Sequence, residues 1–212
     1  MDQEKRASKY IAVAGNIGAG KSSLTGLLAK HFNWEAFYES VDDNPYLQDF
    51  YEDMRRWSFN LQIYFLSSRF RHQKEMLNDD VNLIQDRTIY EDVEIFAKNL
   101  HQMNLMSDRD FANYEALFKE MSYYLRPPDL LIYLRAQVPT LVRQIQQRGR
   151  DYENTIRIEY LERLNKLYEE WIGDYPHEKL IIDTDDLDFV NDQEDLGKII
   201  DLIDQRIFGL FN

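Results

Sequence analysis

A short segment near the N-terminus has the spacing of a phosphate-binding loop. Residues 15–22 read GNIGAGKS and satisfy G-x-x-x-x-G-K-[ST]. The glycines let backbone N–H groups converge on an anion, and the helix expected after them adds the positive end of its dipole. In such loops Lys21 reaches the β- and γ-phosphates, and the Ser22 hydroxyl holds Mg²⁺. We expect a nucleoside triphosphate to bind at Gly15, Asn16, Ile17, Gly18, Ala19, Gly20, Lys21, Ser22 and Ser23.

Two acidic residues follow apolar segments at places suited to phosphoryl transfer. Asp86 closes the run at 81–85, where phosphate-loop enzymes carry a Walker-B acid, and Arg87 follows it at the junction. Glu39 follows a short segment at 35–38, and open α/β sheets bind ligands at the carboxyl ends of their strands. For Glu39, a solvated loop carboxylate is an equal alternative.

Two expected helices carry polar or aromatic residues on faces that a ligand can reach. Gln62 and Arg69 lie in a Gly- and Pro-free segment at 53–77, on nearly the same face and two turns apart. Asp92 and Phe96 are four residues apart on the helix that a capping box starts at Thr88. The alternatives are a Gln and an Arg paired within the protein, a solvated Asp92 and a core Phe96.

A segment around Gly149 has the composition of a loop that closes over phosphates. Arg148 and Arg150 flank the glycine, and acidic residues follow at 151–153. The alternative is an ordinary charged turn between two helices.

Apolar runs alternate with helical segments along the whole chain. We expect strands at 10–14, 35–38, 81–85, 129–134 and 179–183, and helices after the loop to about 31, at 53–77, from 88, and at 106–125, 138–148, 157–172 and 196–208. This alternation indicates βαβ units, a parallel sheet and an α/β fold. Without repeats or linkers, residues 1–212 are expected to form one domain.

Composition narrows the class of protein. The net charge of −13 argues against a nucleic-acid surface, which needs clustered cations. Because cysteine is absent, disulfides and thiolate metal sites are excluded. The sequence has no run of 18 apolar residues and no apolar segment at its start, so we expect no membrane span or signal peptide and a cytoplasmic enzyme.

Several of these segments together resemble the deoxynucleoside kinases, and most closely the bacterial branch of that family. The resemblance rests on the loop at 15–22, YESVDDNPYL from Tyr38, RWSFNLQIYFLSSRFR from Arg56, DRTIYED from Asp86 and QQRGRDYE from Gln146. It implies a P-loop NTPase-type three-layer fold with a five-stranded parallel sheet flanked by helices. It also implies a short arginine-bearing lid at about 146–154.

The resemblance assigns roles in phosphoryl transfer. Glu39 matches the carboxylate that takes the proton of the 5′-hydroxyl, and Arg87 matches an arginine near the transferred phosphate. Lys21 stabilises charge on that phosphate, and Asp86 corresponds to an acid that helps Ser22 to position Mg²⁺. Arg148 and Arg150 match the arginines of the lid.

The resemblance also assigns the acceptor site. Tyr51 and Glu153 match the pair that holds the 3′-hydroxyl, and Gln62 matches the amide that pairs with the base edge. Arg69 and Asp92 match a charged pair around the base, and Phe96 matches the ring stacked on it. The sequence departs from many relatives at Asp86, Gln144 and Ser40, which replace a Glu, a lid arginine and a proline.

The implied activity is ATP-dependent phosphorylation of a deoxyribonucleoside to its 5′-monophosphate in nucleotide salvage. Deoxyadenosine is the favoured acceptor, followed by deoxyguanosine and deoxycytidine. The family also implies a homodimer and feedback inhibition by a deoxynucleoside triphosphate. Alternatives are a nucleoside monophosphate kinase of thymidylate-kinase type, which needs further cations for the acceptor's phosphate, and a GTP-binding switch, for which residues 165–168 lack the required acid.

Overall fold

The computed structural model describes residues 8–38, 44–76, 81–150, 153 and 156–209. Its strands are β1 (Tyr10–Gly15), β2 (Glu35–Phe37), β3 (Leu83–Asp86), β4 (Leu130–Arg135) and β5 (Lys179–Asp183). Its helices are α1 (Lys21–Phe32), α2 (Leu47–Glu52), α3 (Met54–Met76), α4 (Ile89–Glu91), the π-helix η1 (Asp92–Ala97), α5 (Lys98–Gln102), α6 (Asp108–Ser122), α7 (Val138–Arg148), α8 (Ile158–Asp174) and α9 (Gln193–Ile207). None of these helices is long and apolar enough to cross a membrane.

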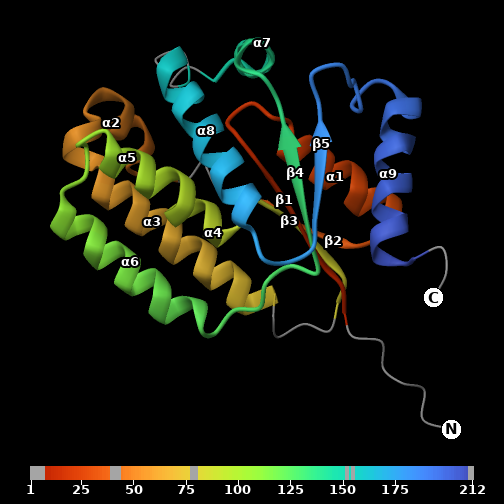
Figure 1. The fold of residues 1–212 in the computed structure, drawn as a ribbon, viewed down its shortest axis with the longest axis horizontal. Coiled ribbons are helices and arrows are strands. Elements are labelled where there is room, and N and C mark those ends of the chain that lie inside the picture. Colours follow the sequence, from red (N-terminus) through yellow and green to blue (C-terminus); the bar gives the residue numbers. More distant parts are fainter. Residues whose placement is uncertain (1–7, 39–43, 77–80, 151–152, 154–155, 210–212) are drawn as a thin grey trace, which may run out of the picture.

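The strands form one parallel sheet in the order β2-β3-β1-β4-β5. Along β1, Ile11 and Val13 face one apolar cluster, while Tyr10, Ala12 and Ala14 face another, because side chains alternate along a strand. Helices α1, α7 and α9 cover the first face, and α3, α6, α8 and η1 contribute to the cover of the second (Figure 1). The predicted α/β class and five-stranded parallel sheet are confirmed.

The register of the two central strands brings the phosphate loop beside the Walker-B position. Val13 lies opposite Asp86 in the β1–β3 pairing. The backbone N–H of Arg87 then donates to the carbonyl of Val13 at 2.9 Å. Gly15 ends β1 only two residues further on, so the loop, Asp86 and Arg87 meet at the carboxyl edge of the sheet.

Several boundaries differ from the sequence prediction. Helix α2 was not expected, and the segment that follows α4 winds as a π-helix over Asp92–Ala97 rather than as α-helix. Helix α6 is shorter than 106–125 because Ser107 caps its start by accepting from the N–H of Asp110. Helix α9 starts earlier than 196, at Gln193, where Asp192 serves as the cap. The capping box at Thr88 and Glu91 is confirmed.

Candidate active site

A cleft of about 870 Å³, counting solvent at its mouth, opens at the carboxyl edge of the sheet, beside Asp86 and Arg87. It brings together most side chains that the sequence selected: Ile17, Lys21, Ser22, Tyr51, Gln62, Asp86, Arg87, Asp92, Phe96, Arg148, Arg150 and Glu153. Apolar residues of α2 and α3, among them Leu47, Phe50 and Phe65, complete its walls. Glu39 and Ser40 lie outside the residues that the structure describes.

The phosphate loop depends on glycines where the chain passes close to its neighbours. Gly18 has a φ of +84°, and a Cβ there would lie 2.8 Å from the carbonyl oxygen of Leu141. Gly20 has a φ of +89° and immediately precedes α1, so the loop leads directly into a helix N-terminus. At the foot of the loop, the Lys21 ammonium donates to the carbonyl of Asn16 at 2.9 Å.

Ser22 and Asp86 form a pair that suits a magnesium ion. The Ser22 hydroxyl donates to one carboxylate oxygen of Asp86, and the other carboxylate oxygen is buried without a hydrogen-bond partner among the described residues. No group of three or more His, Asp and Glu side chains that could hold a metal occurs in the described part of the chain. A hydroxyl and one carboxylate, completed by phosphates and water, match the usual environment of Mg²⁺.

The cleft is also lined by buried polar groups of α3 and η1. Gln62 is 3% exposed, and its side-chain oxygen has no hydrogen-bond partner within the described ranges. Arg69 donates twice to Asp92, from Nε at 2.7 Å and from Nη2 at 3.0 Å. Arg69 does not line this cleft but a smaller hollow beside Tyr38. The ion pair therefore fixes the Asp92 carboxylate in the cleft wall.

Arg87 lines the cleft and is 5% exposed. Its backbone has a φ of +67°, an uncommon conformation for a residue with a side chain. Its guanidinium lies over the Phe96 ring, 4.5 Å from the ring centroid. Nη1 donates to the hydroxyl of Tyr168 at 2.9 Å and lies 3.4 Å from Glu91 Oε1. Arg87 therefore contacts Phe96 and lines the same cleft as Lys21.

Glu153 binds both arginines of the segment predicted to form a lid. Arg148, at the end of α7, donates from Nε to Glu153 Oε2 at 3.1 Å and from Nη2 to Oε1. Arg150 Nη1 lies 3.8 Å from the same carboxylate, which is 4% exposed. Gly149 ends α7 with a φ of +68°, which provides the turn between the two arginines. Both arginines and the predicted sugar-binding acid thus form one cluster.

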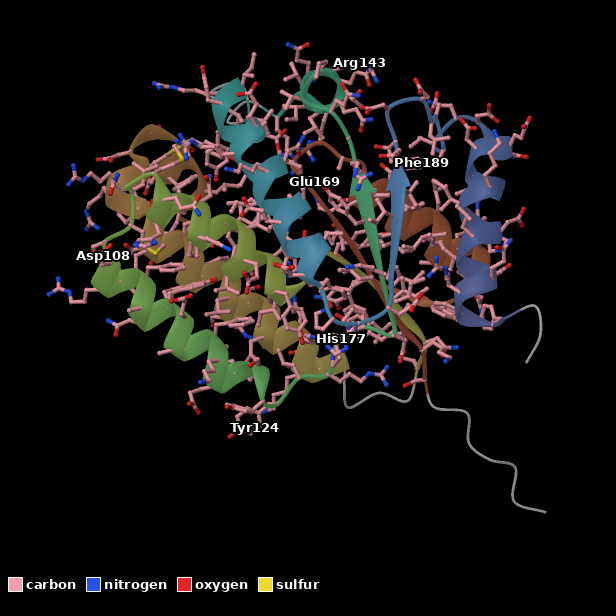
Figure 2. The ribbon with its side chains drawn as sticks, viewed as in Figure 1. Asp108, Tyr124, Arg143, Glu169, His177 and Phe189 are labelled. Atoms are coloured by element: carbon pink, nitrogen blue, oxygen red, sulfur yellow. The ribbon has the colours of Figure 1, made fainter. Side chains whose placement is uncertain are left out.

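A second hollow of about 1610 Å³, open to solvent, adjoins the phosphate loop. It is lined by Ser23, by Arg143 and Gln144 of α7, and by the loop that follows β5. Phe189 of that loop packs so close to Gly20 that a Cβ on the glycine would lie 2.9 Å from its ring. Figure 2 shows Arg143 at the top of the view and Phe189 near the arrowhead of β5.

Sequence reasoning missed the residues of α8 that hold the phosphate loop. Asn165 accepts from the side-chain amide of Asn16 at 2.7 Å, and the Tyr168 hydroxyl lies 2.8 Å from the carbonyl of Gly15. Glu91 was recognised only as a helix cap. The pattern gave no signal for these contacts, because they join segments that are about 75 to 150 residues apart.

The chain is similar to known proteins over nearly its whole length. The family model described as deoxynucleoside kinase matches residues 11–208. A deoxyadenosine/deoxycytidine kinase of Bacillus subtilis (strain 168) is 43% identical, with 92% of each chain covered. A deoxyadenosine kinase of Dictyostelium discoideum is 41% identical over 90% of this chain and 77% of its own. The solved structure of deoxyadenosine kinase from M. mycoides with bound dATP has a TM-score of 0.82 at 32% identity, covering 92% of this chain and 99% of that one.

Proposed function

The chain belongs to the deoxynucleoside kinase family, and we propose that it transfers the γ-phosphate of ATP to the 5′-hydroxyl of deoxyadenosine, with deoxyguanosine and deoxycytidine as weaker acceptors. The observation that carries this proposal is one cleft lined by residues of the phosphate loop and by a buried amide, the carboxylate of a buried ion pair and an aromatic ring. The preference for deoxyadenosine is supported by the relatives that phosphorylate it.

The donor phosphates would bind at the loop, where backbone N–H groups and Lys21 oppose their charge. Phosphoryl transfer needs alignment and charge neutralisation rather than a covalent intermediate. Ser22 and Asp86 would hold Mg²⁺, and the bound ion would help to neutralise the charge of the donor phosphates. Arg87, Arg148 and Arg150 would stabilise the charge that develops on the transferring group.

The acceptor would bind with its base against Phe96 and its edge against Gln62. An amide offers a donor and an acceptor side by side, and the buried oxygen of Gln62 can accept a hydrogen bond from the base. Tyr51 and Glu153 would hold the 3′-hydroxyl. Because Glu153 also binds Arg148, sugar binding and the position of the lid are expected to be coupled.

Glu39 is the proposed general base, a role that contributes about 10²- to 10⁴-fold to rate. It lies outside the described residues, so its assignment stands on the family resemblance. Membership of the deoxynucleoside kinase family argues against both alternatives, a thymidylate-type kinase and a GTP-binding switch. We also propose a cytoplasmic homodimer, one domain with a lid at 146–154, and inhibition by a deoxynucleoside triphosphate, as the dATP-bound relative suggests.

The deciding experiment is turnover with ATP and Mg²⁺ across the four deoxynucleosides, with deoxyadenosine monophosphate as a fifth acceptor. We expect the highest kcat/KM for deoxyadenosine and no measurable turnover of the monophosphate. Faster turnover of the monophosphate would refute the proposed acceptor class. Glu39→Gln should lower kcat far more than it raises the nucleoside KM, and an unchanged kcat would remove Glu39 from its role.

A further inference from the structure

The hydroxyl of Tyr168 lies at a junction of three segments that are far apart in the sequence. It accepts from Arg87 Nη1 at 2.9 Å, and it lies 2.7 Å from Glu91 Oε1 and 2.8 Å from the carbonyl oxygen of Gly15. All of these groups are buried within the structure. One side chain of α8 therefore joins the start of the phosphate loop to the arginine that lines the cleft.

The Glu91 carboxylate contacts groups outside the helix start that it caps. Its Oε2 accepts from the backbone N–H and the hydroxyl of Thr88, at 2.7 and 3.1 Å. Its Oε1 points to the other side, toward Arg87 Nη1 and the Tyr168 hydroxyl, and the N–H of Gly15 donates to it at 3.3 Å. The capping contacts fix one oxygen of the carboxylate and so fix the direction of the other.

The hydroxyl of Tyr168 stays protonated, because burial raises its pKa well above the ordinary value. It has one hydrogen to donate and two acceptors within reach, the Glu91 carboxylate and the Gly15 carbonyl. The hydroxyl oxygen can also accept a hydrogen bond, and Arg87 Nη1 donates that bond. Arg87 is thereby given a neutral acceptor next to an anchored carboxylate, which suits a buried cation.

We propose that Tyr168 and Glu91 are positioning residues that set the orientation of Arg87 for phosphoryl transfer. Arg87 has a long side chain with about 2 kcal/mol of rotamer entropy, so a useful orientation must be imposed on it. The Phe96 ring covers one face of the guanidinium, and Tyr168 with Glu91 fixes Nη1. This inference rests on the role in transfer that we propose for Arg87.

The test uses a variant that removes only the hydroxyl. Tyr168→Phe keeps the ring that stacks on Tyr133, 5.5 Å between centroids and 14° between planes. We expect kcat to fall about 10- to 100-fold, the size of a lost hydrogen bond to a charged group, while both KM values stay within about threefold. Glu91→Gln is the independent second variant, and we expect a similar fall in kcat.

Tyr133→Phe is the matched control. It removes the hydroxyl of the neighbouring stacked ring, which donates to Glu169 of α8 at 3.1 Å and not to Arg87 or Glu91. Figure 2 labels Glu169 on that helix. We expect its kcat to equal that of the parent, with thermal unfolding used to confirm that all variants are folded. An equal loss of kcat in Tyr133→Phe would overturn the proposal.

A double-mutant cycle separates this inference from the role of Arg87 itself. Arg87→Met should lower kcat, and adding Tyr168→Phe to it should change kcat less than about twofold, because the hydroxyl acts through the guanidinium. A full further loss in the double variant would refute the positioning role. So would a raised KM for ATP at unchanged kcat, which would assign the hydroxyl to the phosphate loop alone. If Arg87→Met keeps the parent kcat, the proposed role of Arg87 fails first, and the inference fails with it.

Discussion

Replacing Asp92 by asparagine tests how far the buried ion pair supports the fold as well as the acceptor site. The Asp92 and Arg69 side chains are 2% and 5% exposed and share two hydrogen bonds. Asparagine keeps the shape of the side chain but removes its charge, so the guanidinium of Arg69 loses its buried counter-charge. Removing one partner of a buried pair costs about 3–5 kcal/mol of folding free energy.

For a chain of this size, 1 kcal/mol shifts the Tm by about 2–4 °C. Because asparagine still accepts a hydrogen bond, we take the lower end of the range, about 3 kcal/mol. The expected fall in Tm is then roughly 6–12 °C. The assay is thermal unfolding followed by circular dichroism without nucleoside, since a ligand that binds only the folded state would mask part of the change.

The control for this prediction is an ion pair on the surface. Arg135 contacts Glu169 at 3.0 Å, with the two side chains 40% and 48% exposed. Exposed pairs contribute about 0–1 kcal/mol, so Glu169→Gln should move the Tm by no more than about 4 °C. An Asp92→Asn protein that unfolds as close to the parent as this control would refute the reasoning from burial.

A double replacement separates stability from recognition. Arg69→Met with Asp92→Leu removes both charges and leaves apolar side chains of similar length. Replacing a buried pair in this way is often neutral or stabilising, so we expect the Tm to recover most of the loss. Discrimination among the four deoxynucleosides should stay impaired, because the polar group of the cleft wall is gone. A double variant with parental discrimination would remove the ion pair from base selection.

Three further changes test other parts of the cleft. Gly18→Ala places a Cβ 2.8 Å from the carbonyl oxygen of Leu141, so KM for ATP should rise at least about tenfold, and parental kinetics would contradict the close approach. Gln62→Ala removes the buried amide, at a cost of about 1–3 kcal/mol, so the nucleoside KM should rise and base preference should change. Ser22→Ala should raise the Mg²⁺ concentration for half-maximal activity, and an unchanged Mg²⁺ titration would refute the assignment.

Local patterns predicted the parts of the fold that depend on neighbouring residues. The phosphate loop, the strand that precedes it and the capping box at Thr88 follow from spacings of a few residues, and the structure has them. The π-helix at 92–97 could not be read from the sequence, because its register is set by packing against α3, α6 and α8. Helix α2 is too short to show a periodicity of its own.

In the candidate site, too, the sequence predicted some residues and could not show the contacts of others. Gln62 and Arg69 were selected because they are polar residues on a largely apolar helix, and both are buried. Of the two, Gln62 lines the main cleft and Arg69 lines the smaller hollow. Their exact partners depend on η1, which packs against α3. Tyr168 looked like any core aromatic on α8, since nothing in its own helix marks the hydroxyl. Only the tertiary structure shows that this hydroxyl meets Arg87 and the phosphate loop.

The cations of the cleft have partners within the protein. Lys21 binds the carbonyl of Asn16, Arg87 contacts Glu91, and Arg148 binds Glu153. A chain with a net charge of −13 otherwise repels a triphosphate, so these cations must supply the local attraction. We expect Lys21 and Arg148 to exchange these protein acceptors for phosphate oxygens when a triphosphate binds, while Arg87 keeps its contact with Glu91. Of these partners, Glu153 is also the proposed holder of the sugar, so the exchange at Arg148 links the donor and the acceptor through one carboxylate.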